Sequence, residues 1–318
     1  MPLDDRIKRR LKLRDLNILT TVIQSGSMGK AAAALAMTQS AVSKSIADLE
    51  HILGVHLLDR SRRGIDPTMY GRALNQCGLT LFDDLRQGLE LIDFLADPTV
   101  GELRIGTTPA LATYVIPAIL EPMSQQYPRV VFHVSEADTS VLYRELNDRR
   151  VDLVMTRMPE RSADEGVVER VLFHDPLVVA AGVGNPWTKR RKVALSDLMH
   201  EPWTLSEGES FIGGFVGHAF LASGLALPQT TVFTSSIHLR SKLLAGGRFL
   251  TIVPRFVLTG PLKDQTLRAL PIDLPKTRRP VGIVTLRNRT ISPVAQLFIG
   301  GAREIAMSIP GAVKTRES

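Results

Sequence analysis

Apolar residues recur every three or four positions along the first part of the chain, which is the spacing of a buried helix face. The spacing predicts three helices, over residues 13–25, 28–36 and 38–54. Gly26 is expected to end the first helix, while Ser27 and Thr38 are expected to cap the second and the third. A small three-helix unit is therefore predicted at the start of the chain.

The third helix has an unusual exposed face. The side that must be buried carries Val42, Ile46, Leu49 and Leu53. The opposite side is small and polar, and carries Gln39, Ser40, Ser43, Lys44, Ala47 and His51. Because a solvated helix face usually favours Glu and Lys, this composition indicates close contact with a partner.

A basic hairpin follows this helix. Short strands are expected at Val55–Leu58 and Ile65–Asp66, around a basic tip at residues 60–64 in which Gly64 supplies the turn. Thr68 is well placed to cap the next helix, which runs to about residue 95.

This long helix repeats apolar residues in a roughly heptad rhythm. They are Leu74, Cys77, Leu81, Leu85, Leu89, Ile92 and Leu95. At 1.5 Å per residue the helix would be about 40 Å long, which is more than a small domain needs. We expect it to pair with another helix and Cys77 to be buried among its apolar neighbours. Packing against its own domain is the alternative.

From residue 102 onward, strand-like and helix-like segments alternate. The order βαβαβ, from "ELRIG" to "VDLVMTR", favours a parallel sheet with helical crossovers. A second set of strands and helices follows, and the end of the chain is expected to return to the first set. We predict two α/β lobes with a cleft between them. The first lobe is expected at about 102–160 and 266–318, and the second at about 161–265, after a hinge at 96–101.

Composition limits the classes of protein that remain. The chain has 318 residues, 44% of them hydrophobic, which suffices for two or three domains with substantial cores. Its formal net charge of +7 suits a polyanionic partner, and the first fourteen residues are markedly basic. Neither a signal peptide nor an apolar run long enough to span a membrane is visible. We expect a soluble, cytoplasmic protein without a membrane partner.

Catalytic and metal-binding patterns are weak. A single cysteine excludes an intramolecular disulfide and a Cys-based zinc site. The seven histidines are scattered, without i,i+4 pairing or a nearby carboxylate cluster. The glycine-rich "GGFVGH" does not follow the strand-turn pattern of a dinucleotide fingerprint. We therefore expect no enzymatic activity, no metal and no cofactor.

A short helix, a turn and a polar-faced helix form the helix-turn-helix arrangement, whose second helix lies in the major groove of DNA. Gln pairs with adenine, Ser with donor or acceptor edges, and Lys with guanine or phosphate. Arginines at the hairpin tip suit the flanking backbone, where they add affinity and salt dependence. An ordinary small helical domain with a solvated Ser-rich face is the alternative.

The segment "SGSMGKAAAALAMTQSAVSKSIADLEHILGVHLLDRSRRGIDPT" resembles the winged helix-turn-helix of the LysR-type transcriptional regulators. "GELRIG", "YPRVVFHV", "LNDRRVDLVM" and "GRFLTIVP" are similar to the effector-binding domain of that family. The resemblance implies an α/β protein with a helical winged domain at 13–68, a dimerising linker helix at 69–95, and a two-lobed, periplasmic-binding-protein-like effector domain at 102–318. The N-terminal lead-in to the first helix and the segment "DLRQGLELI" are similar to those of LysR-type subgroups that control sugar-uptake or aromatic-acid genes.

The resemblance also implies partners and site residues. The partners are promoter DNA, a second copy or three further copies of the chain, RNA polymerase and a small-molecule effector. The DNA-binding residues would be Ser27, Thr38, Gln39, Ser40, Ser43, Lys44, Arg60, Arg62 and Arg63. The effector would lie between the lobes, at Thr107, Thr108, Thr139, Ser140, Arg157, Ser206, Phe211, Ser235 and Ser236. Each of these hydroxyls taken singly is equally consistent with a plain helix cap, and Arg157 with a solvated hinge.

Two other interpretations stay open at this point. A solute-binding protein or an enzyme with an incidental basic N-terminus would have no use for the polar-faced helix. A regulator whose sensor domain binds no ligand would show a filled or collapsed cleft.

Overall fold

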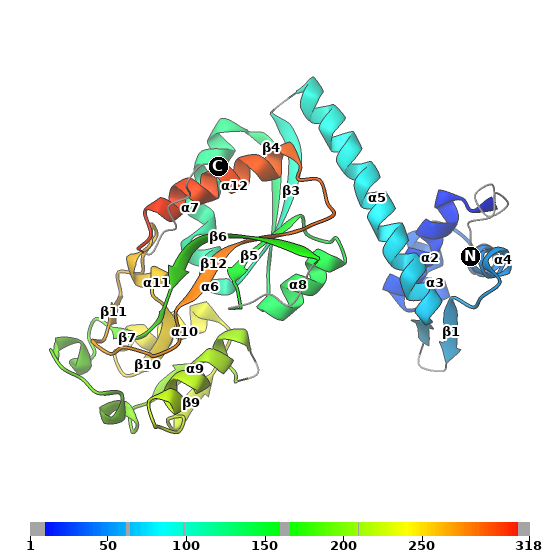
Figure 1. Cartoon of the computed structure of the whole chain (residues 1–318). Coiled ribbons are helices and arrows are strands. Elements are labelled where there is room, and N and C mark those ends of the chain that lie inside the picture. Colours follow the sequence, from blue (N-terminus) through cyan, green and yellow to red (C-terminus); the bar gives the residue numbers. More distant parts are fainter. Residues whose placement is uncertain (1–9, 62–63, 98, 160–165, 209, 311–318) are drawn as a thin grey trace. The chain divides into compact units, whose positions relative to one another are not determined.

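The computed structural model describes residues 10–61, 64–97, 99–159, 166–208 and 210–310 (Figure 1). The chain divides into two compact units, Met1–Leu89 and Glu90–Ser318. Each unit has its own buried apolar core, and the second unit is built from two sheets.

The N-terminal unit contains the three predicted helices and the hairpin. They are α2 (Leu13–Ser25), α3 (Met28–Ala34), α4 (Gln39–Leu53), β1 (Leu58–Ser61) and β2 (Gly64–Pro67). Gly26 ends α2 in the left-handed conformation, as expected. The first strand was predicted too early, since it begins at Leu58 and includes Arg60. The basic tip is therefore partly strand, because cross-strand pairing continues up to Ser61 and Gly64.

The long helix α5 covers Met69–Ala96. Thr68 Oγ1 accepts a hydrogen bond from the Gly71 amide at 3.1 Å, which confirms the predicted cap. A side chain at Gly71 would lie 2.0 Å from the Leu57 carbonyl oxygen, so only glycine lets the helix start this close to the hairpin. Cys77 is exposed, contrary to the expectation of a buried thiol. Its apolar neighbours recur at heptad spacing on α5 but do not cover it.

The first lobe is a five-stranded sheet in the order β4-β3-β5-β12-β6. Its strands are β3 (Val100–Thr107), β4 (Arg129–Glu136), β5 (Leu153–Arg157), β6 (Val167–Asp175) and β12 (Arg279–Leu286). Its helices are α6 (Pro109–Tyr114), α7 (Ile116–Gln126), α8 (Thr139–Asn147) and α12 (Pro293–Met307). As predicted, β3 is parallel to both β4 and β5. The helical segment between β3 and β4 breaks at Val115, two residues before Pro117.

The second lobe is a five-stranded sheet in the order β11-β7-β10-β8-β9. Its strands are β7 (Leu177–Gly182), β8 (Trp203–Leu205), β9 (Thr230–Phe233), β10 (Leu250–Pro254) and β11 (Leu267–Ala269). Its helices are η1 (Pro186–Lys189), η2 (Leu195–Leu198), α9 (Phe211–Ala222), α10 (Ile237–Ala245) and α11 (Phe256–Thr259). Trp203 is fully buried and stacks edge-on against Phe220.

The boundaries of the lobes differ from those expected. Strand β6 pairs with β12 in the first sheet, although the second lobe was expected from residue 161. Strand β11 pairs with β7 in the second sheet, although the first lobe was expected from residue 266. Both errors arise because antiparallel pairing between distant strands leaves no local signal in the sequence.

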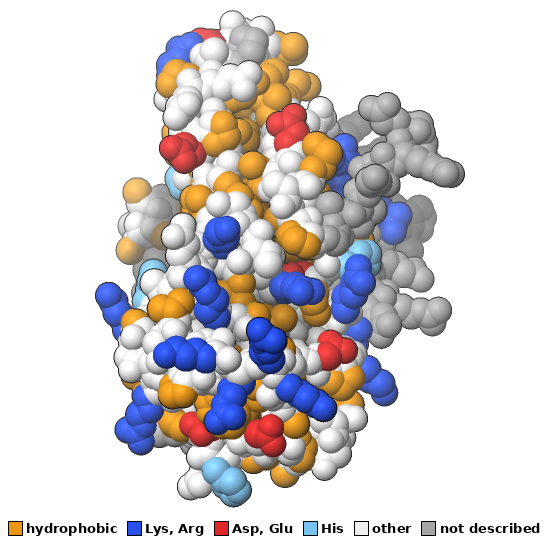
Figure 2. Space-filling model, turned by 90° about the vertical axis from the view of Figure 1, so that its left-hand side faces the viewer, with side chains coloured by type: hydrophobic (Ala, Val, Ile, Leu, Met, Phe, Trp, Pro, Cys, Tyr) orange, Lys and Arg blue, Asp and Glu red, His pale blue; other side chains and the backbone are white. Residues whose placement is uncertain are grey.

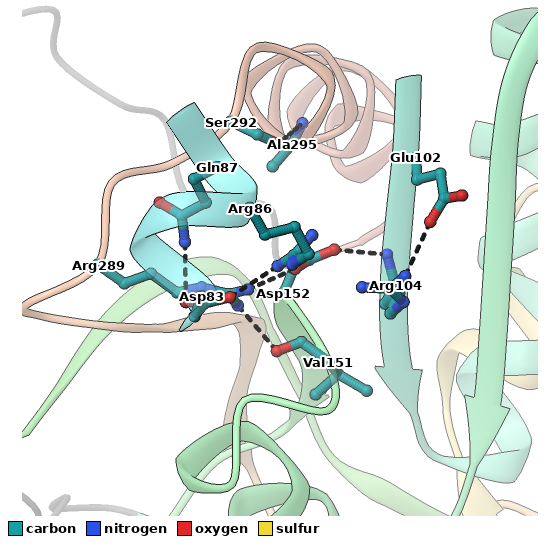
Figure 3. A network of polar contacts seen from close by, with 10 residues as sticks. All are labelled: Asp83, Arg86, Gln87, Glu102, Arg104, Val151, Asp152, Arg289, Ser292 and Ala295. Carbon is teal, nitrogen blue, oxygen red and sulfur yellow. Dashed lines mark hydrogen bonds and ion pairs between the residues drawn. The ribbon is translucent and has the colours of Figure 1, made fainter. Parts of the chain in front are cut away.

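Hydrogen bonds between its strands and loops stabilise the first lobe (Figure 3). Asp152, just before β5, accepts hydrogen bonds from the Arg104 amide of β3 at 2.7 Å and from Arg289 Nη2 at 2.5 Å. Arg289 also donates to the Val151 carbonyl at 2.9 Å. These contacts connect the start of β5 with β3 and with the loop after β12. Figure 3 also shows Asp83 of α5 bonded to Gln87, one turn further along the helix.

Candidate nucleic-acid interface and effector cavity

Helix α4 separates its two faces as the sequence predicted. Thr38 Oγ1 caps it by accepting a hydrogen bond from the Ala41 amide at 3.2 Å. Val42 and Ile46 are fully buried in the core of the N-terminal unit. The polar side consists of Gln39, Ser40 and Lys44, which are exposed, and Ser43, which is half-buried. An exposed row of short hydrogen-bonding side chains is what contact with base edges requires.

Ser27 lies close to the start of α4. It occupies the N-cap position of α3, as predicted, but its side chain makes no capping hydrogen bond. A Cβ added to Gly29 would lie 3.8 Å from Gln39 Oε1 and 3.9 Å from Ser27 Oγ. The start of α3 therefore presents its hydroxyl and its free backbone amides beside the first residue of α4.

Glu50 positions the hairpin beside α4. Its Oε1 accepts hydrogen bonds from the Leu57 amide at 2.7 Å and the Leu58 amide at 3.3 Å. From the other side of the hairpin, the Ile65 amide donates to the Gly26 carbonyl at 3.2 Å. The predicted wing contacts Arg62 and Arg63 lie outside the described residues, and Arg60 lies on β1. The role of Glu50 was not predicted from the sequence, because its partners are backbone amides beyond the end of its own helix.

A basic groove of about 590 Å³ lies beside α4. Its lining includes Lys12 and Arg14 from the start of the chain and Lys44 from α4. Positive side chains next to the polar face of α4 suit a phosphate backbone.

A second cavity, of about 100 Å³, lies between the two lobes. Five of the residues predicted to bind an effector line it, namely Thr108, Thr139, Ser206, Phe211 and Ser235. They come from the N-terminal ends of α6, α8 and α9, from the end of β8 and from the loop before α10. The cleft between the lobes is thus narrow, but it is not filled.

The other predicted residues lie outside this cavity. Thr107 is fully buried and donates to the Met155 carbonyl at 3.1 Å. Ser140 is exposed on α8, and Ser236 caps α10 by accepting a hydrogen bond from the Leu239 amide at 3.2 Å. Arg157 is bound to Asp175. Ser236 is therefore a plain helix cap, which was one of the two roles that the sequence left open for it.

Asp138 and Arg240, which were not predicted from the sequence, also line the cavity. Asp138 Oδ1 accepts a hydrogen bond from the Ser140 amide and caps α8, while its Oδ2 accepts one from the Phe211 amide at 3.1 Å. This carboxylate therefore joins the two lobes. Only the cap of α8 has a local signal in the sequence, because α9 begins 73 residues further along the chain.

Arg240 of α10 is buried, with 6% of its surface exposed. Its Nη2 donates to Ser206 Oγ at 2.9 Å and to the Thr234 carbonyl at 2.7 Å. Burial lowers the pKa of Arg240 to about 10, so the guanidinium stays protonated at neutral pH. The cavity therefore has a permanent positive charge in its wall.

Two family models match the chain over the elements just described. Residues 13–72 match "Bacterial regulatory helix-turn-helix protein, lysR family", and residues 96–306, more than half of the chain, match "LysR substrate binding domain". The chain belongs to the LysR family of transcriptional regulators. The fold class and the family predicted from the sequence are confirmed.

Curated relatives of the LysR family support the same conclusion. GbpR of Azospirillum brasilense is 26% identical over 299 residues, which are 93% of this chain and 87% of the relative. The dual regulator OxyR of Escherichia coli is 27% identical over 275 residues, covering 86% of this chain and 89% of the relative. These relatives are transcriptional regulators and not enzymes.

Solved structures show the same fold. A full-length OxyR variant from Pseudomonas aeruginosa superposes with a TM-score of 0.70 at 19% identity, covering 96% of this chain and 99% of that one. Full-length CbnR, in a complex with its target DNA, gives a TM-score of 0.61 at 19% identity over 92% of this chain and 99% of that one.

Arg157 and Asp175 form a buried ion pair where this LysR-family chain passes between its lobes. Arg157 Nη2 donates to Asp175 Oδ2 at 2.7 Å, and Nη1 donates to the carbonyls of Asp175 and Thr277. Asp175 also accepts hydrogen bonds from the Arg255 and Phe256 amides of the second lobe. Burial is the main influence on both groups, because it lowers the pKa of Arg157 and raises that of Asp175. Arg157 thus stabilises the crossover, which is the point between β6 and β7 where the chain passes from the first lobe to the second. The sequence had suggested an effector contact or a solvated hinge for this residue.

Positive charge extends well beyond the N-terminal unit. Figure 2 shows Lys and Arg side chains gathered over the lower half of one face of the molecule. In the second lobe, the basic run at residues 189–192 is exposed throughout. Net charge alone therefore does not locate a DNA interface, and the polar face of α4 is the stronger argument.

Among the described residues, no group of His, Cys, Asp and Glu side chains is arranged to hold a metal ion. No described helix is both long enough and apolar enough to cross a membrane.

Proposed function

We propose that this regulator recognises its operator through the exposed face of α4 and binds the flanking phosphates through the basic residues around it. The observation that carries the proposal is the row formed by Gln39, Ser40, Ser43 and Lys44, opposite a fully buried apolar face. Ser27, at the start of α3, is expected to contact a phosphate through a helix N-terminus. The wing residues Arg60, Arg62 and Arg63 are expected to contact the adjacent backbone.

Titration with DNA tests this proposal. The full-length protein is mixed with the intergenic DNA upstream of its own gene and with a scrambled duplex, each at two salt concentrations. Tighter binding to the upstream DNA supports operator recognition. Equal and strongly salt-dependent binding to both duplexes would reduce the interface to a nonspecific attraction for phosphate.

Two substitutions on α4 should have different signatures. Ser43→Ala is expected to weaken binding to the operator by about 1–3 kcal/mol and to leave scrambled DNA nearly unaffected, because Ser43 contacts a base. Lys44→Ala is expected to weaken both and to reduce the salt slope by about one unit, because Lys44 lies in the basic groove. Fluorescence anisotropy with both duplexes measures these effects. Equal losses on both duplexes for Ser43→Ala would remove it from the base-contacting residues.

We further propose that a small molecule binds in the cavity between the lobes and changes the arrangement of the subunits on DNA, and hence contact with RNA polymerase. Thr108 and Thr139 from the first lobe face Ser206, Phe211 and Ser235 from the second lobe across this cavity. An effector acts only through different affinities for two arrangements, and a site shared by two lobes supplies such a difference. Because bacterial promoters lie in the cytoplasm, we propose that the protein acts there.

Helix α5 is proposed as the dimer seam. Leu85, Leu89 and Ile92 expose 52%, 55% and 62% of their surface and follow the heptad spacing. Leu89→Lys is expected to shift the protein to a lower association state in sedimentation velocity, because a charge would enter an apolar seam. Gln76→Lys, at another exposed position of α5, should leave the association state unchanged. An unaltered sedimentation coefficient for Leu89→Lys would place the dimer contact elsewhere.

A further inference from the structure

Arg240 is a buried cation without a carboxylate partner among the described residues. Two other buried arginines of this unit each pair with an aspartate, Arg157 with Asp175 and Arg289 with Asp152. Arg240 instead donates to two uncharged oxygens, those of Ser206 and Thr234. Its Nε is buried and makes no hydrogen bond. A buried charge is normally paired, so Arg240 differs from these two arginines in having no ion pair among the described residues.

The groups around Arg240 favour an anion. Ser206 Oγ accepts a hydrogen bond from the guanidinium, so the hydroxyl keeps its own proton for another acceptor. Ser235 lines the cavity from the same lobe and Thr108 from the other, and each adds a hydroxyl. The hydroxyl of Thr139, which also lines the cavity, is hydrogen-bonded to Thr156 Oγ1 at 2.9 Å. Charge-assisted hydrogen bonds from a guanidinium to a carboxylate are shorter and stronger than bonds between neutral groups.

Asp138, the one described acid in the lining, does not offset Arg240. Its carboxylate accepts hydrogen bonds from the Ser140 amide and hydroxyl and from the Phe211 amide. It therefore faces the N-terminal ends of α8 and α9, whose positive ends stabilise its charge. The positive charge of Arg240 remains for a ligand.

The remaining lining and the size of the cavity limit the rest of the ligand. Ile237, Ile252 and Pro254 supply apolar surface. The volume of about 100 Å³ is smaller than the cavity of about 150 Å³ that admits benzene, so a ligand of about five non-hydrogen atoms fits.

We propose that the effector is a small carboxylate with a short apolar body, whose anionic group pairs with Arg240 and Ser206. This inference rests on the proposed function of the cavity as the effector site. It names the chemical class of the effector and the residue that selects its charge.

Sodium propionate is the probe, because it combines a carboxylate with a two-carbon body. Its binding to the full-length protein is followed by calorimetry and by thermal unfolding. The neutral isostere propionamide and sodium chloride at equal ionic strength serve as references. Propionate is expected to raise Tm in a saturable manner, while propionamide and chloride are not.

Variants assign the effect to Arg240. Arg240→Gln is expected to raise the Kd for propionate by on the order of 10- to 100-fold, because a charge-assisted bond is lost. Arg240→Lys keeps the charge and should retain part of the binding, which separates a charge effect from simple misfolding. Arg268→Gln removes an exposed arginine from β11 of the same lobe and should leave Kd unchanged.

Three outcomes would overturn the inference: equal binding of propionamide, undiminished binding by Arg240→Gln, or no saturable response to propionate. Operator binding is measured in parallel on the same protein. If operator preference is intact and propionate does not bind, only the carboxylate assignment fails. If operator preference is absent, the proposed regulatory function itself fails.

Discussion

Arg157→Ala is expected to lower the free energy of unfolding of the C-terminal unit by about 3–5 kcal/mol, because it leaves the buried Asp175 carboxylate without its cation. Asp175 is the last residue of β6, and only Pro176 separates it from β7 of the second lobe. Its other hydrogen bonds reach the start of α11, so the loss should also loosen the connection between the lobes. Burial, which already lowers the pKa of Arg157 and raises that of Asp175, shows how poorly either charge is tolerated alone.

Denaturant unfolding followed by tryptophan fluorescence measures this effect. Trp187 and Trp203 both lie in the second lobe, and they are the two tryptophans of the chain, so the signal reports the C-terminal unit. Arg150→Ala is the matched control, since its ion pair with Asp148 is exposed and is expected to contribute less than about 1 kcal/mol. Similar losses for Arg157→Ala and Arg150→Ala would show that the buried pair does not hold the crossover.

Ile46→Ala is expected to abolish operator binding through loss of the N-terminal fold. Ile46 is fully buried at the centre of the core formed by α2, α3 and α4. Truncating a buried isoleucine to alanine costs about 2–5 kcal/mol, a large part of the stability of a small domain. The far-UV circular dichroism transition should shift to lower denaturant, while the tryptophan transition of the C-terminal unit should stay in place.

The neighbouring position gives the control. Ala47 lies on the exposed side of the same helix, so Ala47→Ser should change stability by no more than about 0.5 kcal/mol. Comparison with Ser43→Ala then separates two ways of losing operator affinity. Ile46→Ala acts through the core, whereas Ser43→Ala is expected to leave unfolding unchanged. If Ile46→Ala retained full stability and affinity, the assignment of α4's buried face would be wrong.

The local sequence pattern was sufficient to predict the helices of the N-terminal unit. The period of Val42, Ile46 and Leu49, the cap at Thr38 and the turn at Gly26 each depend on residues within one or two helical turns. Burial and capping of α4 therefore followed from the sequence, and with them the separation of its polar face. The one clear error in the hairpin, the start of β1, concerns a pairing across two strands.

Five residues that line the cavity between the lobes were also predicted, through the resemblance to the LysR family and their positions along the chain. Thr108, Thr139 and Phe211 stand at helix starts that follow strands, and Ser206 and Ser235 follow the ends of β8 and β9. In open α/β sheets the carboxyl ends of the strands meet at one edge, so these positions converge.

Only the tertiary structure decided the other contacts. It placed β6 and β11 in their sheets, linked Asp138 to the start of α9, and turned Arg157 towards Asp175. It also buried Arg240 in the cavity wall without an acidic partner among the described residues. The sequence by itself determined the helices, the caps of α4 and α5, the family and the polar face of α4, because those depend on neighbours along the chain. Charge pairing and cavity lining depend on side chains that lie far apart along the chain, 137 residues in the case of Arg289 and Asp152, and only folding brings these together.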